Sequence, residues 1–295
     1  MNSKYIIAGL LFCTILHTSC EDPIEVDNGF ETPQFVVDAW INNNIDETQI
    51  ISLSLTQDYF DNRLPDAIAD AEVNVSTSSA ASYDFEHIGD GKYSWTPEAG
   101  SNIGEIGDTY IMTVNHNGEI YTSTTQLHPV PEIDSIRIYF EDEAFGADNG
   151  LYAEIYARDL PGKGNTYWVK SYRNDTLLNK PQELNLIYDA TFDAGTDIDG
   201  TAFIRPLRFA VNALDEDGLP RDLDIGDKVG CEIHSISNEA FRFLQIAQEQ
   251  TSNGDNGIFT IPVANSKGNV YDSNEERVLG VFNVAAISSL EKTVE

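Results

Sequence analysis

Two short acidic turns carry the residue types that come closest to metal chemistry. Three aspartates within residues 193–199 precede Gly200, and two within residues 215–217 precede Gly218. A calcium loop needs oxygen ligands at alternate positions, a glycine at the turn and a later bidentate acid. With either glycine in its required place, the first ligand position lacks a side-chain oxygen. We therefore expect solvated turns and no bound cofactor, with weak calcium binding at the surface as the alternative.

Side chains that serve as nucleophiles, bases or zinc ligands do not form a recognisable set. Cys231 and His234 are three residues apart on an expected strand and would point to opposite faces, so we expect Cys231 to be buried. The other histidines fall on separate segments, and no HExxH or GxSxG motif is present. The turn at residues 161–164 lacks the first glycine of a phosphate-binding loop. The sequence therefore predicts no metal site, no catalytic residues and a protein that is not an enzyme.

The charge of the chain narrows the class of partner. Its 49 acidic residues outnumber 17 basic ones, and a net charge of −32 repels phosphate backbones, which predicts no nucleic-acid binding. Arg205 and Arg208 are conspicuous in such a chain, and they either pair with nearby acids or mark a contact with a carboxylate.

Trp95 and Trp168 are expected to lie in the core, with a stacking platform for a sugar or peptide as the alternative.

The first twenty residues carry the clearest chemical signal. Lys4 precedes an apolar run at residues 5–16, which matches the core of a signal peptide and is too short to span a bilayer as a helix. Small residues and then Cys20 follow, as in a lipobox, although His17 stands where leucine is favoured. In a lipobox the cysteine thiol receives a diacylglyceryl group and becomes the mature N-terminus. We therefore expect residues 1–19 to be a lipoprotein signal peptide and Cys20 to anchor the chain in a lipid bilayer, with an ordinary secretory signal as the alternative.

The elements that must position these residues are mainly strands. After an acidic tether at residues 20–33, short runs alternate between apolar and polar residues, which is the period of a strand buried on one face. Seven such runs fall within residues 34–128, at 35–41, 51–55, 71–75, 83–85, 93–95, 110–114 and 119–125. This number and spacing predict an immunoglobulin-like β-sandwich.

A proline-containing joint at residues 128–131 marks the expected domain boundary, because proline fixes φ and removes a hydrogen-bond donor. Residues 132–295 predict a second β-rich domain with strands at 135–140, 151–157, 166–172, 184–188, 203–213, 228–234 and 278–286. One helix is expected near residues 238–251, capped by Ser237 or Asn238. The predicted fold is all-β: an N-terminal immunoglobulin-like sandwich, then a second β-rich domain that carries one helix.

Six segments distributed along the chain carry a resemblance to known proteins. They are LSLTQDYFDNRLPDAIADAEVNV from Leu53, GDTYIMTVNHNGEIYTS from Gly107, LHPVPEIDSI from Leu127, NTYWVKSYRND from Asn165, GDKVGCEIHSISNEAFRFL from Gly226 and GNVYDSNEERVLGVFNVAA from Gly268. In this order they resemble a family of Bacteroidota outer-membrane lipoproteins that is defined as a domain of unknown function. The resemblance implies a lipoprotein often encoded beside TonB-dependent receptors, and it implies no catalytic residues. The acidic residues after Cys20 resemble the surface-export signal of that phylum, which implies display toward the cell exterior.

These observations favour a surface-exposed outer-membrane lipoprotein that acts as a non-catalytic accessory or binding subunit. Its expected partner is a TonB-dependent receptor or another outer-membrane β-barrel. A structural or adhesive surface module is the first alternative, and genome context would separate the two. A lipid-anchored hydrolase is the second, and it would require paired carboxylates near a histidine in a cleft that forms only in three dimensions.

Overall fold

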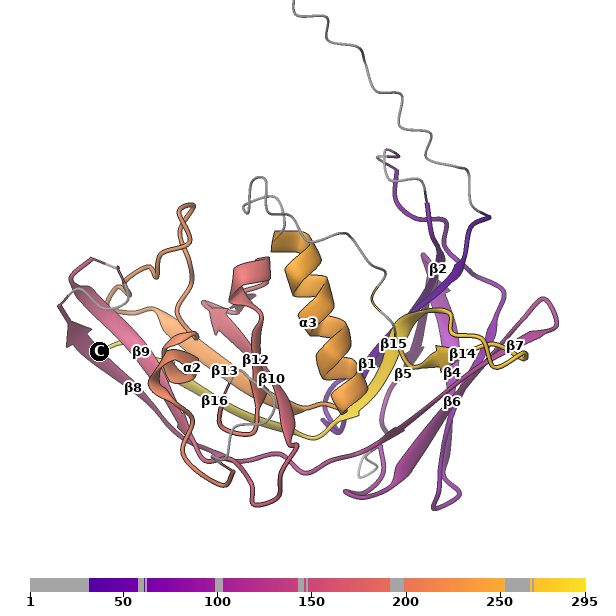
Figure 1. Cartoon of the computed structure of the whole chain (residues 1–295), viewed down its shortest axis with the longest axis horizontal. Coiled ribbons are helices and arrows are strands. Elements are labelled where there is room, and N and C mark those ends of the chain that lie inside the picture. The colour runs from indigo at the N-terminus through magenta and orange to yellow at the C-terminus, as the bar shows by residue number, and fades with distance from the viewer. Residues whose placement is uncertain are drawn as a thin grey trace, which may run out of the picture. The chain divides into compact units, whose positions relative to one another are not determined.

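The computed structural model describes residues 32–57, 61, 63–98, 103–142, 146, 148–191, 199–252, 266 and 268–295. Residues 1–32 and 33–295 are separate units, and the fold below is that of the second unit. Cys20, the expected signal peptide and nearly all of the expected tether therefore lie outside the described residues. Strands dominate the described residues, so the protein has the all-β fold that the sequence predicts (Figure 1).

All seven strands that the sequence predicts before residue 128 are present. They are β1 (Phe35–Asn42), β2 (Gln49–Leu55), β3 (Glu72–Thr77), β4 (Ser82–Gly89), β5 (Lys92–Trp95), β6 (Thr109–His116) and β7 (Glu119–Gln126). Along β1, Val37, Ala39 and Ile41 are buried and alternate with more exposed residues. Because side chains of a strand point alternately to opposite faces, this pattern places one face of the strand in the core.

The seven strands form two layers around one hydrophobic core. One layer has the order β5-β2-β1, and the other has the order β4-β3-β6-β7. Strand β4 joins the layers, because Tyr83 and Phe85 pair with β3 whereas Glu86 and His87 pair with β5. Buried residues of both layers belong to a single cluster, which requires the sheet to fold back on itself. This arrangement is a β-sandwich, and it lies in the region where the sequence predicts an immunoglobulin-like one.

Strands from the other end of the chain extend this sandwich. Strand β14 (Val270–Tyr271) pairs antiparallel with β7, and β15 (Leu279–Ala285) pairs in parallel with β1. The approach to β1 is close: a β-carbon on Gly280 would overlap the carbonyl oxygen of Val37, and Gly280 has a φ of +107°. The boundary expected at residues 128–131 therefore does not divide the strand pairing, because residues after it complete the first sheet.

The second β region contains two sheets that share a core. Strands β10 (Thr166–Arg173), β11 (Thr176–Leu177), β12 (Asn185–Tyr188), β13 (Lys228–Ser235) and β16 (Ile287–Thr293) pair in the order β11-β10-β13-β16, with β12 also paired to β10. Strands β8 (Ile133–Glu141) and β9 (Gly150–Ala157) form a separate antiparallel pair. Their buried faces meet in one cluster. Only Ala286 separates β15 from β16, so the C-terminal segment contributes to both β regions (Figure 1).

The segment at residues 203–213 differs from the strand predicted there. It forms a short helix, α2 (Arg205–Phe209), with Pro206 in its first turn. Proline lacks the N–H that a strand ladder needs, whereas its fixed φ suits the start of a helix. Leu207 and Val211 enter the shared core, and Phe209 packs on a neighbouring tyrosine ring instead. The alternation of apolar residues that predicted a strand is therefore satisfied by two different packing sites.

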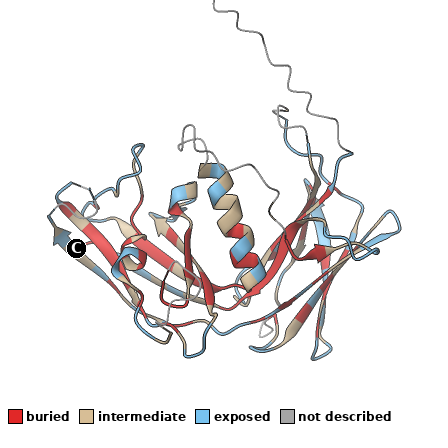
Figure 2. Ribbon diagram, in the orientation of Figure 1, coloured by how far each residue is buried: buried red, intermediate tan, exposed pale blue. Residues whose placement is uncertain are grey.

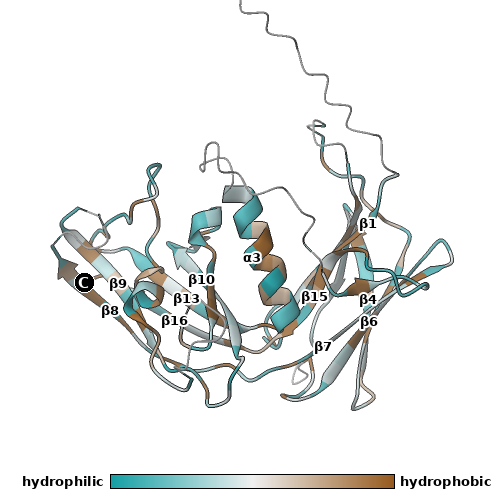
Figure 3. Cartoon of the chain, viewed as in Figure 1, coloured by the Kyte–Doolittle hydropathy of each residue, from teal (hydrophilic) through white to brown (hydrophobic). Residues whose placement is uncertain are grey.

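Helix α3 (Asn238–Ser252) agrees with the helix predicted near residues 238–251. Ser237 caps it, because the backbone N–H of Ala240 donates to Ser237 Oγ at 3.1 Å. The buried residues of α3 contact β10, β12 and β15, and Figures 2 and 3 show a buried, apolar side and an exposed, polar one. The helix also contacts η3 (Pro181–Glu183), a short 3-10 turn. Among the described residues, no helix has the length and apolar character needed to cross a bilayer.

Candidate functional site

A basic pocket lies on the β8–β9 pair. It is a cavity of about 480 Å³, and its lining residues are Arg137, Ile138, Tyr139, Glu154, Tyr156, Arg205, Arg208 and Lys292. Four of the 17 lysines and arginines of the chain therefore line one cavity, together with one carboxylate. In a chain of net charge −32, such a local excess of positive charge indicates a site for an anion.

The two strands supply the floor of the basic pocket. On β8, Arg137 and Tyr139 are two residues apart and share a face. Ile136, directly before Arg137, points to the opposite face and is buried in the core. On β9, Glu154 stands in register opposite Arg137, and Tyr156 lies two residues further along the same face. One face of the strand pair therefore packs on the core, and the other presents charged and aromatic side chains.

Helix α2 and strand β16 supply the walls. Arg205 and Arg208 are three residues apart, so they lie on the same side of α2. Lys292 comes from β16, and its Nζ donates a hydrogen bond to the backbone carbonyl of Ile136 at 3.1 Å. The helical form of α2 brings both guanidinium groups to the pocket. In a strand, two residues that are three apart would instead point to opposite faces.

Glu154 organises the pocket from its centre. The residue is 3% exposed, and its carboxylate accepts hydrogen bonds from Arg205 Nε at 2.8 Å, Tyr139 Oη at 2.8 Å and Tyr156 Oη at 2.9 Å. The Nε of Arg208 lies 3.3 Å from the same carboxylate in an ion pair. A buried carboxylate is stable only when such donors replace its lost hydration. Glu154 therefore holds the surrounding side chains in one arrangement.

The titration behaviour of the pocket favours fixed charges over proton transfer. Burial alone would raise the pKa of Glu154, but hydrogen bonds from Arg205, Tyr139 and Tyr156 and the charge of Arg208 outweigh it and hold the pKa below its usual value. Burial raises the pKa of Tyr139 to about 12. Near neutral pH the carboxylate stays charged and this phenol stays protonated. The pocket therefore offers permanent hydrogen-bond donors and charge, as a binding site requires.

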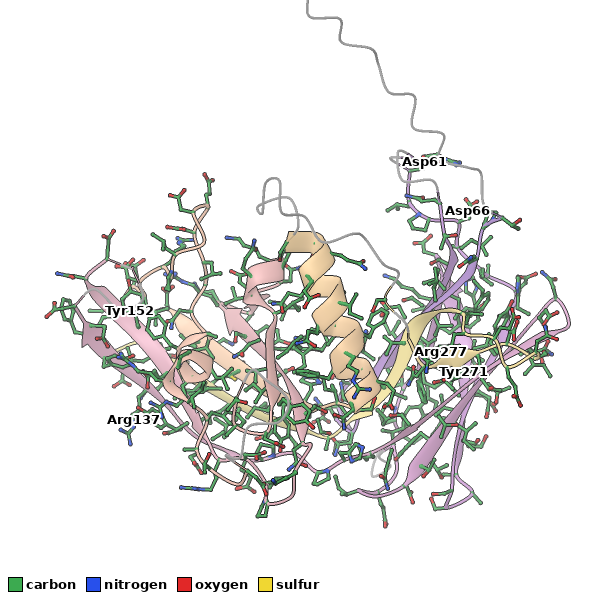
Figure 4. All side chains as sticks on the ribbon, viewed as in Figure 1. Asp61, Asp66, Arg137, Tyr152, Tyr271 and Arg277 are labelled. Atoms are coloured by element: carbon green, nitrogen blue, oxygen red, sulfur yellow. The ribbon has the colours of Figure 1, made fainter. Side chains whose placement is uncertain are left out.

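Arg137 and Lys292, the other two cations of the pocket, are exposed. The Cζ atoms of Arg137 and Arg208 lie 4.4 Å and 4.7 Å from the centroid of the Tyr156 ring, within the range of a cation–π contact. Figure 4 shows Arg137 projecting outward from the ribbon. Among the described residues, the ion pairs of the pocket involve Arg205 and Arg208 but neither Arg137 nor Lys292.

The structure brings together residues that the sequence identified and residues that it did not. Arg205 and Arg208, the two conspicuous arginines, do pair with acids, namely Glu141 and Glu154. They also line a cavity with Arg137 and Lys292. Arg137 stands on the polar face of an alternating strand, which was a weak signal. For Lys292, more than 80 residues further along the chain than Arg208, no local pattern in the sequence indicates the pocket.

Cys231 and His234 do not meet. Cys231 is 1% exposed and lies in the shared core, where burial raises the pKa of its thiol. His234 faces the other side of β13, with its Nε2 at 2.9 Å from Glu232 Oε2 and its ring beside Trp168. The opposite orientation predicted for this pair is confirmed, and no nucleophile–base contact exists between them.

The acidic turns serve the backbone. Asp199 Oδ1 accepts the N–H of Gly162, and Asp215 Oδ1 accepts the N–H groups of Asp217 and Leu219. Asp193 and Asp197 lie outside the described residues. Within the described ranges, no group of three histidine, cysteine, aspartate or glutamate side chains could hold a metal ion. These contacts are those of ordinary turns.

The tryptophans lie at packed positions. Trp95 contacts Tyr83 edge-to-face, with ring centroids 4.8 Å apart, and packs against the sandwich core. Trp168 contacts Trp40 in the same manner at 5.2 Å, and both rings pack beside α3. The structure therefore places both rings against a core, as the first of the two interpretations of the sequence expects.

The comparison with protein families agrees with the extent of this fold. A family model described as "Domain of unknown function (DUF4249)" matches residues 21–291, which include every described strand and helix from β1 to β15. No curated protein and no solved structure matches the chain. Because the match covers nearly all of the 295 residues, the protein belongs to the family defined by the DUF4249 domain.

Proposed function

We propose that the protein is a lipid-anchored, non-catalytic binding subunit, displayed on the outer membrane and acting beside a TonB-dependent receptor or another β-barrel. Lipid on Cys20 would hold the β regions at the membrane surface. The observation that carries the binding role is the basic pocket, whose charged and phenolic groups are fixed around a buried carboxylate. Such preorganised donors suit recognition of a ligand or partner.

The same geometry favours binding over the hydrolase alternative. A glycosidase-like or protease-like site needs a carboxylate or imidazole that is available to move a proton. Glu154 instead accepts three hydrogen bonds and forms an ion pair with Arg208, and its pKa lies below its usual value. Among the described residues that line the pocket there is no histidine.

The anchor is tested by Cys20→Ser, with Cys13→Ser as a matched control. Cys13 lies within the expected signal peptide, so its replacement leaves the acylated residue intact. We expect Cys20→Ser to move the protein from the membrane fraction to the soluble fraction, and Cys13→Ser to behave as wild type. External protease on intact cells then reports display. A Cys20→Ser protein that stays in the membrane fraction would refute the anchor, and full protection from external protease would refute display.

The partner is tested by cross-linking in cells, followed by purification of the full-length protein from its native membrane. We expect an outer-membrane β-barrel to be recovered with wild type and lost with Cys20→Ser, because the anchor sets the local concentration of the two proteins. A β-barrel recovered equally with both would show that the anchor is not needed. Recovery of no β-barrel would refute the accessory role.

A further inference from the structure

The basic pocket carries positive charge that its own carboxylates do not neutralise. Its four cations face Glu141 and Glu154, which pair with Arg205 and Arg208. Four positive charges less two negative charges leave a net charge of two. Outside this pocket the chain has a large excess of acids, so a site of opposite sign is a specific feature of this face.

The two uncompensated charges belong to Arg137 and Lys292, and both have hydrogen-bond donors to offer. The guanidinium of Arg137 lies over the Tyr156 ring, and among the described residues its N–H groups form no ion pair, so they can donate to an acceptor. Lys292 Nζ has three donors, and one of them is directed to the carbonyl oxygen of Ile136. Both side chains are exposed, so a ligand can reach them from solvent.

The rest of the pocket is arranged before any ligand arrives. Glu154 holds Arg208 and the hydroxyl groups of Tyr139 and Tyr156 through its contacts. The ring of Tyr156 in turn supports Arg137. Side chains that are already ordered lose little conformational entropy on binding, which favours even a small ligand.

We propose that the basic pocket binds a small organic dianion, a phosphate monoester or a dicarboxylate, with Arg137 and Lys292 as its direct contacts. The proposal rests on the proposed binding role and names the ligand class. A dianion would balance the two uncompensated charges, and arginine forks match the paired oxygens of carboxylates and phosphates. The volume of about 480 Å³ suits a small molecule. The net charge of −32 disfavours a long polyanion such as nucleic acid.

The test is titration calorimetry on the full-length protein in detergent, at constant low ionic strength and pH 7.5. The probes are glycerol 3-phosphate for the phosphate monoester, succinate for the dicarboxylate, and acetate and glycerol as monoanionic and neutral controls. We expect one or both dianions to bind with 1:1 stoichiometry and acetate and glycerol to bind at least about tenfold more weakly. The dianion that binds more tightly shows whether the ligand is a phosphate monoester or a dicarboxylate.

Variants locate the site. Arg137→Gln and Lys292→Gln should each raise the dissociation constant about tenfold, because each removes one of the two uncompensated charges. Glu141→Gln should lower it, because it leaves Arg205 with less neutralising charge. Arg277→Gln is the matched control: Arg277 also lies over a tyrosine ring, that of Tyr271, outside the pocket (Figure 4). The dissociation constant of Arg277→Gln for the dianion should equal that of wild type.

Two results would overturn the proposal. One is that neither dianion binds more tightly than acetate. The other is that Arg137→Gln and Lys292→Gln bind as tightly as Arg277→Gln while circular dichroism shows all three folded. Neither result affects the membrane fractionation of Cys20→Ser or the recovery of a β-barrel, so failure of the ligand proposal is distinguishable from failure of the proposed function.

Discussion

Replacing Glu154 by glutamine should destabilise the fold more than any other single loss of charge on the β8–β9 pair. The variant keeps the shape of the side chain but removes the charge that Arg205 and Arg208 share. It also turns one acceptor into an NH₂ group that faces the Tyr156 hydroxyl or the Arg208 guanidinium. A tyrosine hydroxyl can also accept, so the mismatch is with arginine: Glu154→Gln sets an NH₂ group against a guanidinium at a buried position.

The size of the effect follows from the burial of the partners. Breaking a fully buried ion pair costs about 3–5 kcal/mol. The Glu154 side chain is 4% exposed, but that of Arg205 is 44% exposed and keeps Glu141 as a partner, so solvent recovers part of the loss. We expect a decrease of about 3 kcal/mol in the free energy of unfolding. With a urea m-value of about 3 kcal/mol per molar for a chain of this size, the midpoint should fall by about 1 M.

The assay is urea unfolding followed by circular dichroism, with Glu86→Gln as the control. Glu86 is an exposed residue of β4, so its replacement should change the free energy of unfolding by less than about 0.5 kcal/mol. The pH adds a second check. Because the folded pKa of Glu154 is below the ordinary value of 4.5, its contribution is complete above that pH and is lost as the pH falls through the folded pKa. The gap between wild type and Glu154→Gln should therefore narrow from pH 7 toward pH 3. Equal midpoints for the two variants at pH 7 would refute the central role assigned to Glu154.

Three further predictions concern the packing around the two β regions. Gly280→Ala should lower the free energy of unfolding by at least about 3 kcal/mol, since the new β-carbon meets the Val37 carbonyl in a left-handed conformation. Gly226 has a φ of +96° but lies in open space, so Gly226→Ala should lower the free energy of unfolding by less in the same urea assay. Asn212→Ala should lower the free energy of unfolding by about 2–3 kcal/mol, because the Asn212 side chain forms hydrogen bonds with both the N–H and the carbonyl group of Ala153. A loss no larger than that of the exposed control Asn115→Ala would contradict this. The Cys231 thiol should resist iodoacetamide in the folded protein and react in urea, because burial raises its pKa and excludes the reagent; rapid labelling of the native protein, read by mass spectrometry, would show that the core opens.

Local patterns in the sequence predict the elements of this fold well. In β1 the alternation of Val37, Ala39 and Ile41 depends only on the two-residue period of a strand, so the sequence suffices to find it. Ser237 caps α3 through a contact three residues away, which is also a local signal. The lipobox around Cys20 is likewise local, and acylation of this residue stays a prediction.

Distant pairings have no comparable signal. Strand β15 pairs with β1 across more than 200 residues of sequence, and no short-range period in the sequence specifies that partner. The choice depends on close approach at Gly280 and on the burial of both strands in one core. The helix at α2 was missed for a related reason: Leu207 and Phe209 alternate as in a strand, but they bury in different clusters.

The amino-acid sequence by itself determined the all-β class, the seven early strands, the long helix and the strong acidity of the chain, because each follows from neighbouring residues or from composition. Only the tertiary structure decided which strands complete the sandwich and that Arg137, Glu154, Arg208 and Lys292 meet in one pocket. The physical reason is that side chains from β8, β9, α2 and β16 converge only after their apolar faces have packed into a common core. Charge complementarity then operates over distances of a few ångströms that no spacing in the sequence records.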